Sequence, residues 1–189
     1  MKAIFFTPHM AIWQHAIAEM HVALLLQKQG WDILVVTCDG ILKGHCAAMS
    51  ANGIREADPP EKKAEICKAC HLNRDELLQS LGLRSVTLES LVSPEKKAEI
   101  LEKVSKVDTD NKEQYAEHGI PVGIYAAYET LLNFKKGNAR FEAVELSEYQ
   151  ASLINSVVSL YAFETLLTRE KPDRVFIYNT LYGLNRSVE

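Results

Sequence analysis

The sequence predicts an α/β fold, a Rossmann-like three-layer arrangement in which a parallel sheet carries helices on both faces. Residues 2–7 and 32–37 are apolar runs without polar alternation, which is typical of strands buried on both faces. Between them, the apolar residues of the segment 12–29 recur at three and four positions and Gly30 follows, which indicates a helix that ends there. Such a crossover is right-handed in nearly all proteins and begins a parallel sheet.

The rest of the chain continues this alternation after a long loop. Residues 38–60 have no periodicity. A loop longer than about 12 to 15 residues usually carries function or is disordered, and the cysteines in this one favour function. Capping residues, prolines and glycines then mark the boundaries of the following elements. We expect a short helix to about Cys70, a second helix from Asn73 to Gly82, a strand at 84–88, helices at 93–107, 120–134 and 146–170, and a strand at 174–178.

One heptapeptide, Pro-Glu-Lys-Lys-Ala-Glu-Ile, occurs at residues 60–66 and again at 94–100. The spacing between the two copies could be the period of a helical repeat protein. However, the residues outside the heptapeptide do not match between the copies, and two predicted strands precede the first copy. We interpret the two copies as similar helix starts. The prediction is therefore one Rossmann-like domain over residues 1–189, with residues 38–70 inserted after the second strand as a cysteine-containing loop and short helix.

Composition and charge narrow the class of protein. The 189 residues are 47% hydrophobic and 24% charged with a formal net charge of -4, as in ordinary globular domains. This charge gives no reason to expect nucleic-acid binding, which needs clustered Lys and Arg. We find neither a signal-peptide core nor an uninterrupted apolar run of the ~20 residues that span a bilayer. The cytoplasm is the expected location, with no integral membrane segment.

The four cysteines are the clearest candidate site. Cys38, Cys46, Cys67 and Cys70 have the spacing C-x7-C-x20-C-x2-C, and cytoplasmic cysteines are seldom disulfide-bonded. Four thiolates complete a tetrahedral Zn²⁺ site, although an iron–sulfur cluster also takes four cysteines. We expect a structural zinc ion ahead of a cluster; the alternative is four buried free thiols. His45 and His71 are weaker ligand candidates.

A second set of candidates lies where ligands bind in open α/β sheets, at the carboxyl ends of strands. His9, Trp13 and His15 follow the first strand, and His9 could serve as a base for a hydroxyl group. After the last strand the candidates are Tyr178, Asn179 and Tyr182, with Asn185 and Arg186 nearby. The alternative for the histidines is that they are ordinary residues of a helix surface. The alternative for the residues after the last strand is that they form the turn that any strand needs at its end. Neither a G-x-G-x-x-G nor a P-loop is present, so a dinucleotide is not expected.

Several segments together resemble the N-terminal domain of GT-B-type glycosyltransferases of surface or capsular polysaccharide biosynthesis. They are the opening strand and helix, the strand at 33–36, the stretch Gly-Ile-Tyr-Ala-Ala-Tyr-Glu-Thr at 123–130, and the long helix leading into Lys-Pro-Asp-Arg-Val-Phe-Ile-Tyr-Asn at 171–179. The cysteine cluster resembles one found in some members of that group. The sequence departs from many of them at residues 7–10, Thr-Pro-His-Met, where they have a glycine-rich acceptor loop.

The resemblance implies an acceptor-side domain that binds a sugar acceptor, with the nucleotide-sugar donor on a missing C-terminal domain. The chain would then be part of a two-domain, metal-ion-independent transferase, inactive alone, with a structural cysteine cluster. The predicted catalytic residue is His9, because of its position after the first strand. Two other functions remain open. The chain could be a stand-alone metal-binding module with four cysteine ligands that organises a partner protein, or an iron–sulfur redox protein.

Overall fold

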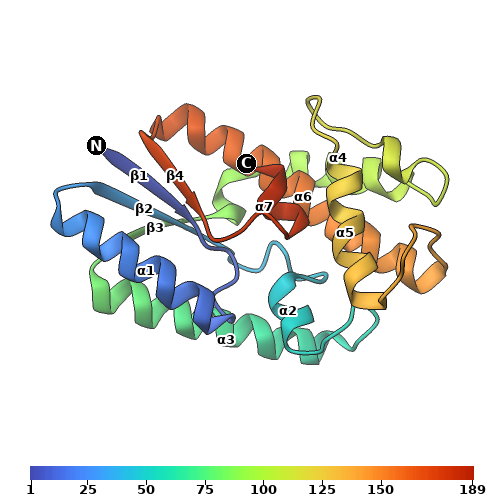
Figure 1. Cartoon of the computed structure of the whole chain (residues 1–189), viewed down its shortest axis with the longest axis horizontal. Helices are drawn as coiled ribbons and strands as arrows, with labels where there is room; N and C mark the ends of the chain where they lie inside the picture. Colours follow the sequence, from blue (N-terminus) through green and yellow to red (C-terminus); the bar gives the residue numbers. More distant parts are fainter.

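The computed structural model describes residues 1–189 and contains a four-stranded, all-parallel sheet (Figure 1). In spatial order the strands are β3 (Arg84–Thr87), β2 (Asp32–Thr37), β1 (Lys2–Phe6) and β4 (Arg174–Ile177). Phe6 at the end of β1 pairs with Val36 of β2 on one side and Ile177 of β4 on the other. This arrangement confirms the predicted Rossmann-like fold.

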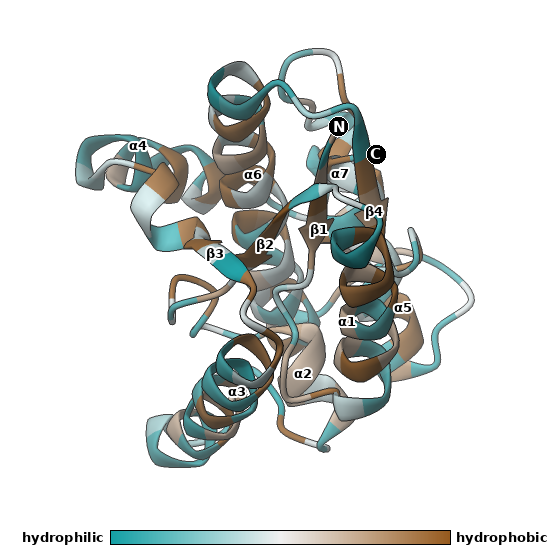
Figure 2. Ribbon diagram, turned by 90° about the vertical axis from the view of Figure 1, so that its left-hand side faces the viewer, coloured by the Kyte–Doolittle hydropathy of each residue, from teal (hydrophilic) through white to brown (hydrophobic).

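Helices cover both faces of this sheet, as predicted. Figure 2 shows the hydrophobic strands β1 and β2 between two layers of helices. The α-helices are α1 (Trp13–Lys28), α2 (Ala47–Ala51), α3 (Pro60–Leu81), α4 (Pro94–Ser105), α5 (Val122–Phe134), α6 (Ala143–Glu170) and α7 (Gly183–Ser187), and two short 3₁₀ helices span Leu88–Leu91 and Lys112–Gln114.

Alternate residues of the strands face two separate cores. Phe5 and Val35 pack in a cluster of 11 buried residues with α1 and α3, whereas Phe6 and Val36 belong to a cluster of 26 buried residues that includes α4, α5, α6 and α7. Because side chains alternate between faces along a strand, the continuous apolar runs of β1 and β2 supply both cores. Truncating a fully buried member such as Leu153 to Ala would cost about 2–5 kcal/mol.

One helix prediction was wrong. Residues 60–81 form the single helix α3 instead of two helices that meet at Asn73. The Asn73 side chain does not cap a helix; its Nδ2 donates to the Met10 carbonyl oxygen at 2.9 Å. No Gly or Pro interrupts the segment before Gly82, which has φ +62° and ends the helix. A tertiary contact therefore accounts for an Asn that resembles a cap in the sequence.

The interpretation of the heptapeptide as a helix start is confirmed. Both copies begin a helix, α3 and α4, with Pro at the first position. Ser93 caps α4 by accepting a hydrogen bond from the Lys96 N–H at 3.2 Å, while the residue before α3 is Pro59 and gives no side-chain cap. The other predicted boundaries differ by at most three residues from those observed. The loop after β2 contains the short helix α2.

One helix has the length and composition of a membrane span. This is α6, and 67% of its most apolar window is buried inside the protein. The buried residues of α6 include Tyr149, Leu153 and Val157, which belong to the larger core. A core helix passes the same test of length and hydropathy, so α6 by itself is a weak indication of membrane insertion.

Candidate functional site

The order of the strands marks the carboxyl ends of β1 and β4 as the place where a ligand is expected. From β1 the chain passes to β2 and β3 on one side, and it returns through α6 to β4 on the other side of β1. The boundary between β1 and β4 is therefore a topological switch point, where open α/β proteins bind ligands beyond the carboxyl ends of the strands. The segments 7–12 and 178–187 follow these two strands.

These two segments and α1 enclose a small cavity, here called the switch-point cavity. Its volume of about 10 Å³ is room for a single water molecule. His15 stacks on Tyr178 with ring centroids 3.9 Å apart, and His9 meets Tyr182 edge-on at 5.7 Å. The lining residues are Phe6, Thr7, Pro8, His9, His15, Glu19, Tyr178, Tyr182 and Asn185.

Several polar atoms in the switch-point cavity have no hydrogen-bond partner within the protein. They are both ring nitrogens of His9, the Oε1 atom of Glu19, the Oγ1 atom of Thr7 and the Oδ1 atom of Asn185, and all four residues are buried. An unsatisfied buried polar group costs roughly 1–3 kcal/mol. Buried polar groups without partners are rare in folded proteins and often mark a place for water, an ion or a ligand.

Burial shifts the protonation of two groups in this cavity in opposite directions. Burial, with a smaller effect of the nearby His15, lowers the pKa of His9 to about 4. Burial raises the pKa of Glu19 to about 7, against a smaller opposing effect of the nearby Thr7 hydroxyl group and Tyr178 backbone. At neutral pH, His9 is therefore a neutral imidazole that can accept or donate a hydrogen bond, and Glu19 has a pKa suited to proton transfer.

The structure brings together most, but not all, of the predicted ligand-binding residues. His9, His15, Tyr178 and Tyr182 line the switch-point cavity. Trp13 does not line it, and 37% of its surface is exposed. Asn179 also lies outside the lining and is used within its loop, because its Oδ1 accepts from the Leu181 N–H and its carbonyl oxygen accepts from Asn185 Nδ2.

Sequence reasoning missed Glu19. The signal was present: Glu19 lies four residues after His15, so the two share a helix face, and it falls among the buried residues Ala16, Met20 and Ala23 of α1. An acidic residue within a buried apolar stripe is unusual unless it has a partner or a function.

The four cysteines line a second cavity, here called the cysteine cavity, of about 20 Å³. Cys38 follows β2, Cys46 immediately precedes α2, and Cys67 and Cys70 lie one turn apart on α3. His71 also lines this cavity, whereas His45 is used elsewhere, with its Nε2 at 3.0 Å from the Ile54 carbonyl oxygen. The fold thus gathers the cysteines of three elements at the carboxyl end of β2.

The cysteines in this cavity are free thiols. Burial raises the pKa of all four, to about 12 for Cys46 and about 11 for Cys70, so they are protonated at neutral pH. The Ala11 N–H donates to Cys70 Sγ at 3.0 Å. No set of three or more His, Cys, Asp or Glu side chains is positioned to hold a metal ion. Zinc has the right donors here, but the thiols would have to lose protons and converge further.

No family model matches this chain, and no match to a curated protein or a solved structure was found.

Proposed function

We propose that this chain is the acceptor-binding domain of a glycosyltransferase and that the acceptor hydroxyl group enters the switch-point cavity. The observation that carries the proposal is the group of unpartnered polar atoms of His9, Glu19, Thr7 and Asn185 at the carboxyl ends of β1 and β4. A sugar hydroxyl can both donate and accept hydrogen bonds, so it would satisfy donors and acceptors there.

The size of the cavity fits a hydroxyl group and excludes a whole sugar ring. Room for one water molecule is also room for one hydroxyl. The ring that bears it would lie outside, near Tyr178, which stacks on His15 and is 46% exposed. An exposed aromatic ring beside a polar cavity is a suitable contact for the apolar face of a sugar.

Glu19 is a better base than His9 for such a reaction at neutral pH. In glycosyl transfer the acceptor oxygen bonds to the anomeric carbon, the bond from that carbon to the nucleotide diphosphate breaks, and the hydroxyl proton passes to a base. With a pKa of about 4, His9 is a weak base, whereas the pKa of about 7 suits Glu19 to this step. His9 would then orient the hydroxyl as a neutral hydrogen-bonding partner.

A carbohydrate-binding assay with two matched histidine variants tests this proposal. The probe is an array of neutral and acidic oligosaccharides, with the 189-residue chain as the binding protein. His15→Ala removes the partner of Tyr178 and should weaken binding about three- to tenfold, the value of one aromatic contact. His21→Ala changes an exposed histidine on the same helix, bonded only to the Ile17 carbonyl oxygen, and should leave binding unchanged.

Three results would count against the proposal. They are an array without any bound carbohydrate, equal binding by the two histidine variants, and turnover of a nucleotide sugar at an ordinary rate by this chain alone. The last would contradict the assignment as an acceptor domain whose donor is held by another domain.

Metal binding is the second candidate function, and the gathering of all four cysteines around one cavity favours it. Zinc, held by Cys38, Cys46, Cys67 and Cys70, would stabilise the segment that connects β2 to α3. Elemental analysis of protein purified without a metal-binding tag, with a visible absorption spectrum, tests this. About one colourless zinc per chain supports a structural site, and iron with sulfide supports the redox alternative. A metal-free protein with the native fold would contradict both.

A further inference from the structure

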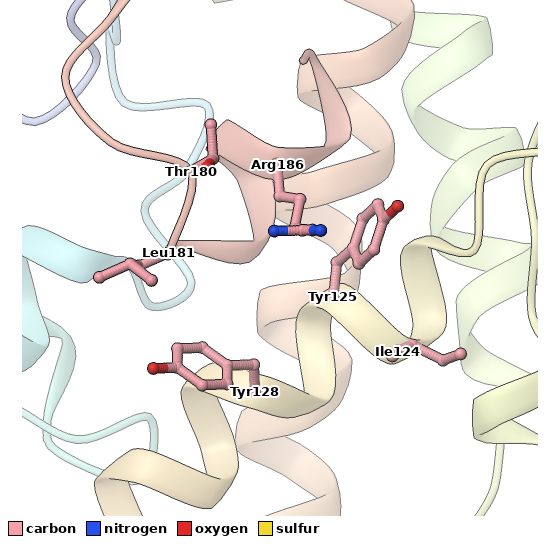
Figure 3. Close-up of a pocket in the computed structure, with 6 residues that line it drawn as sticks. All are labelled: Ile124, Tyr125, Tyr128, Thr180, Leu181 and Arg186. Atoms are coloured by element: carbon pink, nitrogen blue, oxygen red, sulfur yellow. The ribbon is translucent and has the colours of Figure 1, made fainter.

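A separate hollow lies between α5 and the segment that links β4 to α7, and we call it the Arg186 cleft (Figure 3). Tyr125 and Tyr128 extend into it from α5, and Arg186 faces them from α7. Its volume is about 270 Å³, slightly below the roughly 300–1,000 Å³ of pockets for drug-sized ligands, which suits a single ring. The lining residues are Ile124, Tyr125, Tyr128, Thr180, Leu181 and Arg186.

The cleft offers one positive charge on aromatic walls. The Arg186 guanidinium lies 5.2 Å from the centre of the Tyr125 ring, an orienting cation–π contact. The arginines that have carboxylate partners are Arg55, Arg74, Arg84 and Arg169, so the Arg186 charge is not neutralised by an ion pair. A guanidinium held against an aromatic ring keeps N–H groups for bidentate bonding to a carboxylate.

The apolar residues of the cleft are unusually exposed for their size. Tyr128 is 41% and Leu181 60% exposed. In Figure 3 both side chains extend toward the same side of the hollow, Tyr128 from α5 and Leu181 from the segment before α7. Exposed apolar side chains around a few polar groups are typical of ligand sites. Thr180 adds a hydroxyl group that can bond to a sugar hydroxyl.

The same short segment forms one wall of the Arg186 cleft and one wall of the switch-point cavity. Tyr182 and Asn185 line the cavity, while their neighbours Leu181 and Arg186 line the cleft. Close packing fixes this wall, because a Cβ atom at Gly183 would lie 2.8 Å from the Tyr125 carbonyl oxygen. Ligand groups in the two hollows would therefore contact opposite sides of one segment.

We propose that the Arg186 cleft binds a pyranose ring that carries a carboxylate, as a neighbouring residue of the acceptor glycan. This inference rests on the proposed function and adds the substrate class. The carboxylate pairs with Arg186, the ring packs on Tyr128 and Leu181, and a ring hydroxyl reaches Thr180. A neutral sugar would make the ring contacts and would lack the charged one.

The test compares methyl glucuronide with methyl glucoside in NMR titrations of the intact chain. The two probes have the same ring and differ in the carboxylate. We expect the glucuronide to bind about tenfold more tightly, which is the contribution of one charge-assisted hydrogen bond. Its binding should also shift the NMR signals of Tyr125 and Tyr128. Arg186→Gln should abolish the difference. Arg140→Gln, the control, changes an exposed arginine outside the cleft and should preserve it.

The outcomes separate this inference from the proposed function. Equal affinity for both sugars overturns the carboxylate assignment and leaves acceptor binding in place. Binding of neither sugar counts against the proposed function as well. Glucose 6-phosphate is a third probe, and tighter binding of it than of glucuronide would overturn the assignment by indicating a phosphate site. A preference for glucuronide that survives Arg186→Gln would show that the carboxylate is recognised elsewhere.

Discussion

The two cavities at the carboxyl end of the sheet differ in how their polar atoms are satisfied. In the switch-point cavity, His9 and Glu19 are buried with hydrogen-bonding atoms unused, which lowers stability. In the cysteine cavity, the thiols are neutral because burial raises their pKa, and a neutral thiol is inexpensive to bury. The first cavity therefore has polar atoms free to bond to an added group, while the four thiols of the second can bind a metal ion strongly only after they lose protons.

The cavities also touch each other through the segment after β1. Pro8 lines both of them. The Ala11 N–H bonds to Cys70 Sγ and the Met10 carbonyl accepts from Asn73, so α3 holds the loop that carries His9. Variants in one cavity should therefore be checked for an effect in the other.

If Cys38, Cys46, Cys67 and Cys70 hold zinc, removal of that ion should have the largest effect of all these changes. The effect should be confined to the cysteine cavity. Structural zinc sites have apparent binding free energies of about 10–16 kcal/mol at neutral pH, so a chelator or Cys67→Ser should loosen residues 38–70. Hydrogen exchange measures this by segment. We expect slow exchange to persist in β1 and the centre of α1, where Ala16 and Met20 are fully buried. Uniform loosening of the whole chain would argue against a local structural site.

The pH dependence of stability should separate His9 from Glu19. Glu19 has its pKa raised from 4.5 to about 7, so the folded state binds its proton more tightly and stability falls as pH rises through this range. For His9 the pKa falls from 6.5 to about 4, so stability falls as pH decreases through that range. Between pH 4.5 and 6.5, where the two ranges overlap, the contributions of Glu19 and His9 to the pH dependence of stability therefore have opposite signs.

Single variants separate these two opposing contributions to the pH dependence of stability. Relative to the wild type, Glu19→Gln should gain up to about 3 kcal/mol as pH rises from 4.5 to 7, because a shift of one pKa unit corresponds to about 1.4 kcal/mol. His9→Gln should gain a similar amount relative to the wild type as pH falls from 6.5 to 4. Urea unfolding at several pH values measures both. Parallel stability curves for the wild type and either variant would refute the corresponding shift.

Glu129 should have the next largest effect, through the wall between the switch-point cavity and the Arg186 cleft. Its Oε1 atom accepts from the Gly183 N–H at 2.7 Å and its Oε2 atom from the Ser152 hydroxyl. Glu129→Leu leaves two buried donors without an acceptor and should cost about 2 kcal/mol in urea unfolding. Glu129→Gln keeps an acceptor for Gly183 and should cost less. Equal losses would mean that the charge, and not the hydrogen bond, holds α7.

The sequence predicted the fold and the position of Cys38 after β2 because local pattern determines both. The metal site at the four cysteines stays a prediction. Buried parallel strands are readable as apolar runs, and Cys38 was placed at the end of β2 for that reason. The continuity of α3 was not predicted, because Asn73 serves a tertiary contact with Met10. Glu19 and the Arg186 cleft depend on which helices meet in space, which a single sequence does not record.

Substitution of Trp13 should have the smallest effect, because Trp13 lies on a different face of α1 from His15. Trp13 was predicted beside His15 as a ligand contact, but residues two apart on a helix point in different directions. His15 and Glu19 share the face that lines the switch-point cavity, and Trp13 does not line it. We expect Trp13→Ala to change carbohydrate binding less than about twofold, within about 0.5 kcal/mol of the wild type as for most exposed substitutions. A loss as large as that of His15→Ala in the same assay would mean that the acceptor extends over the outer face of α1.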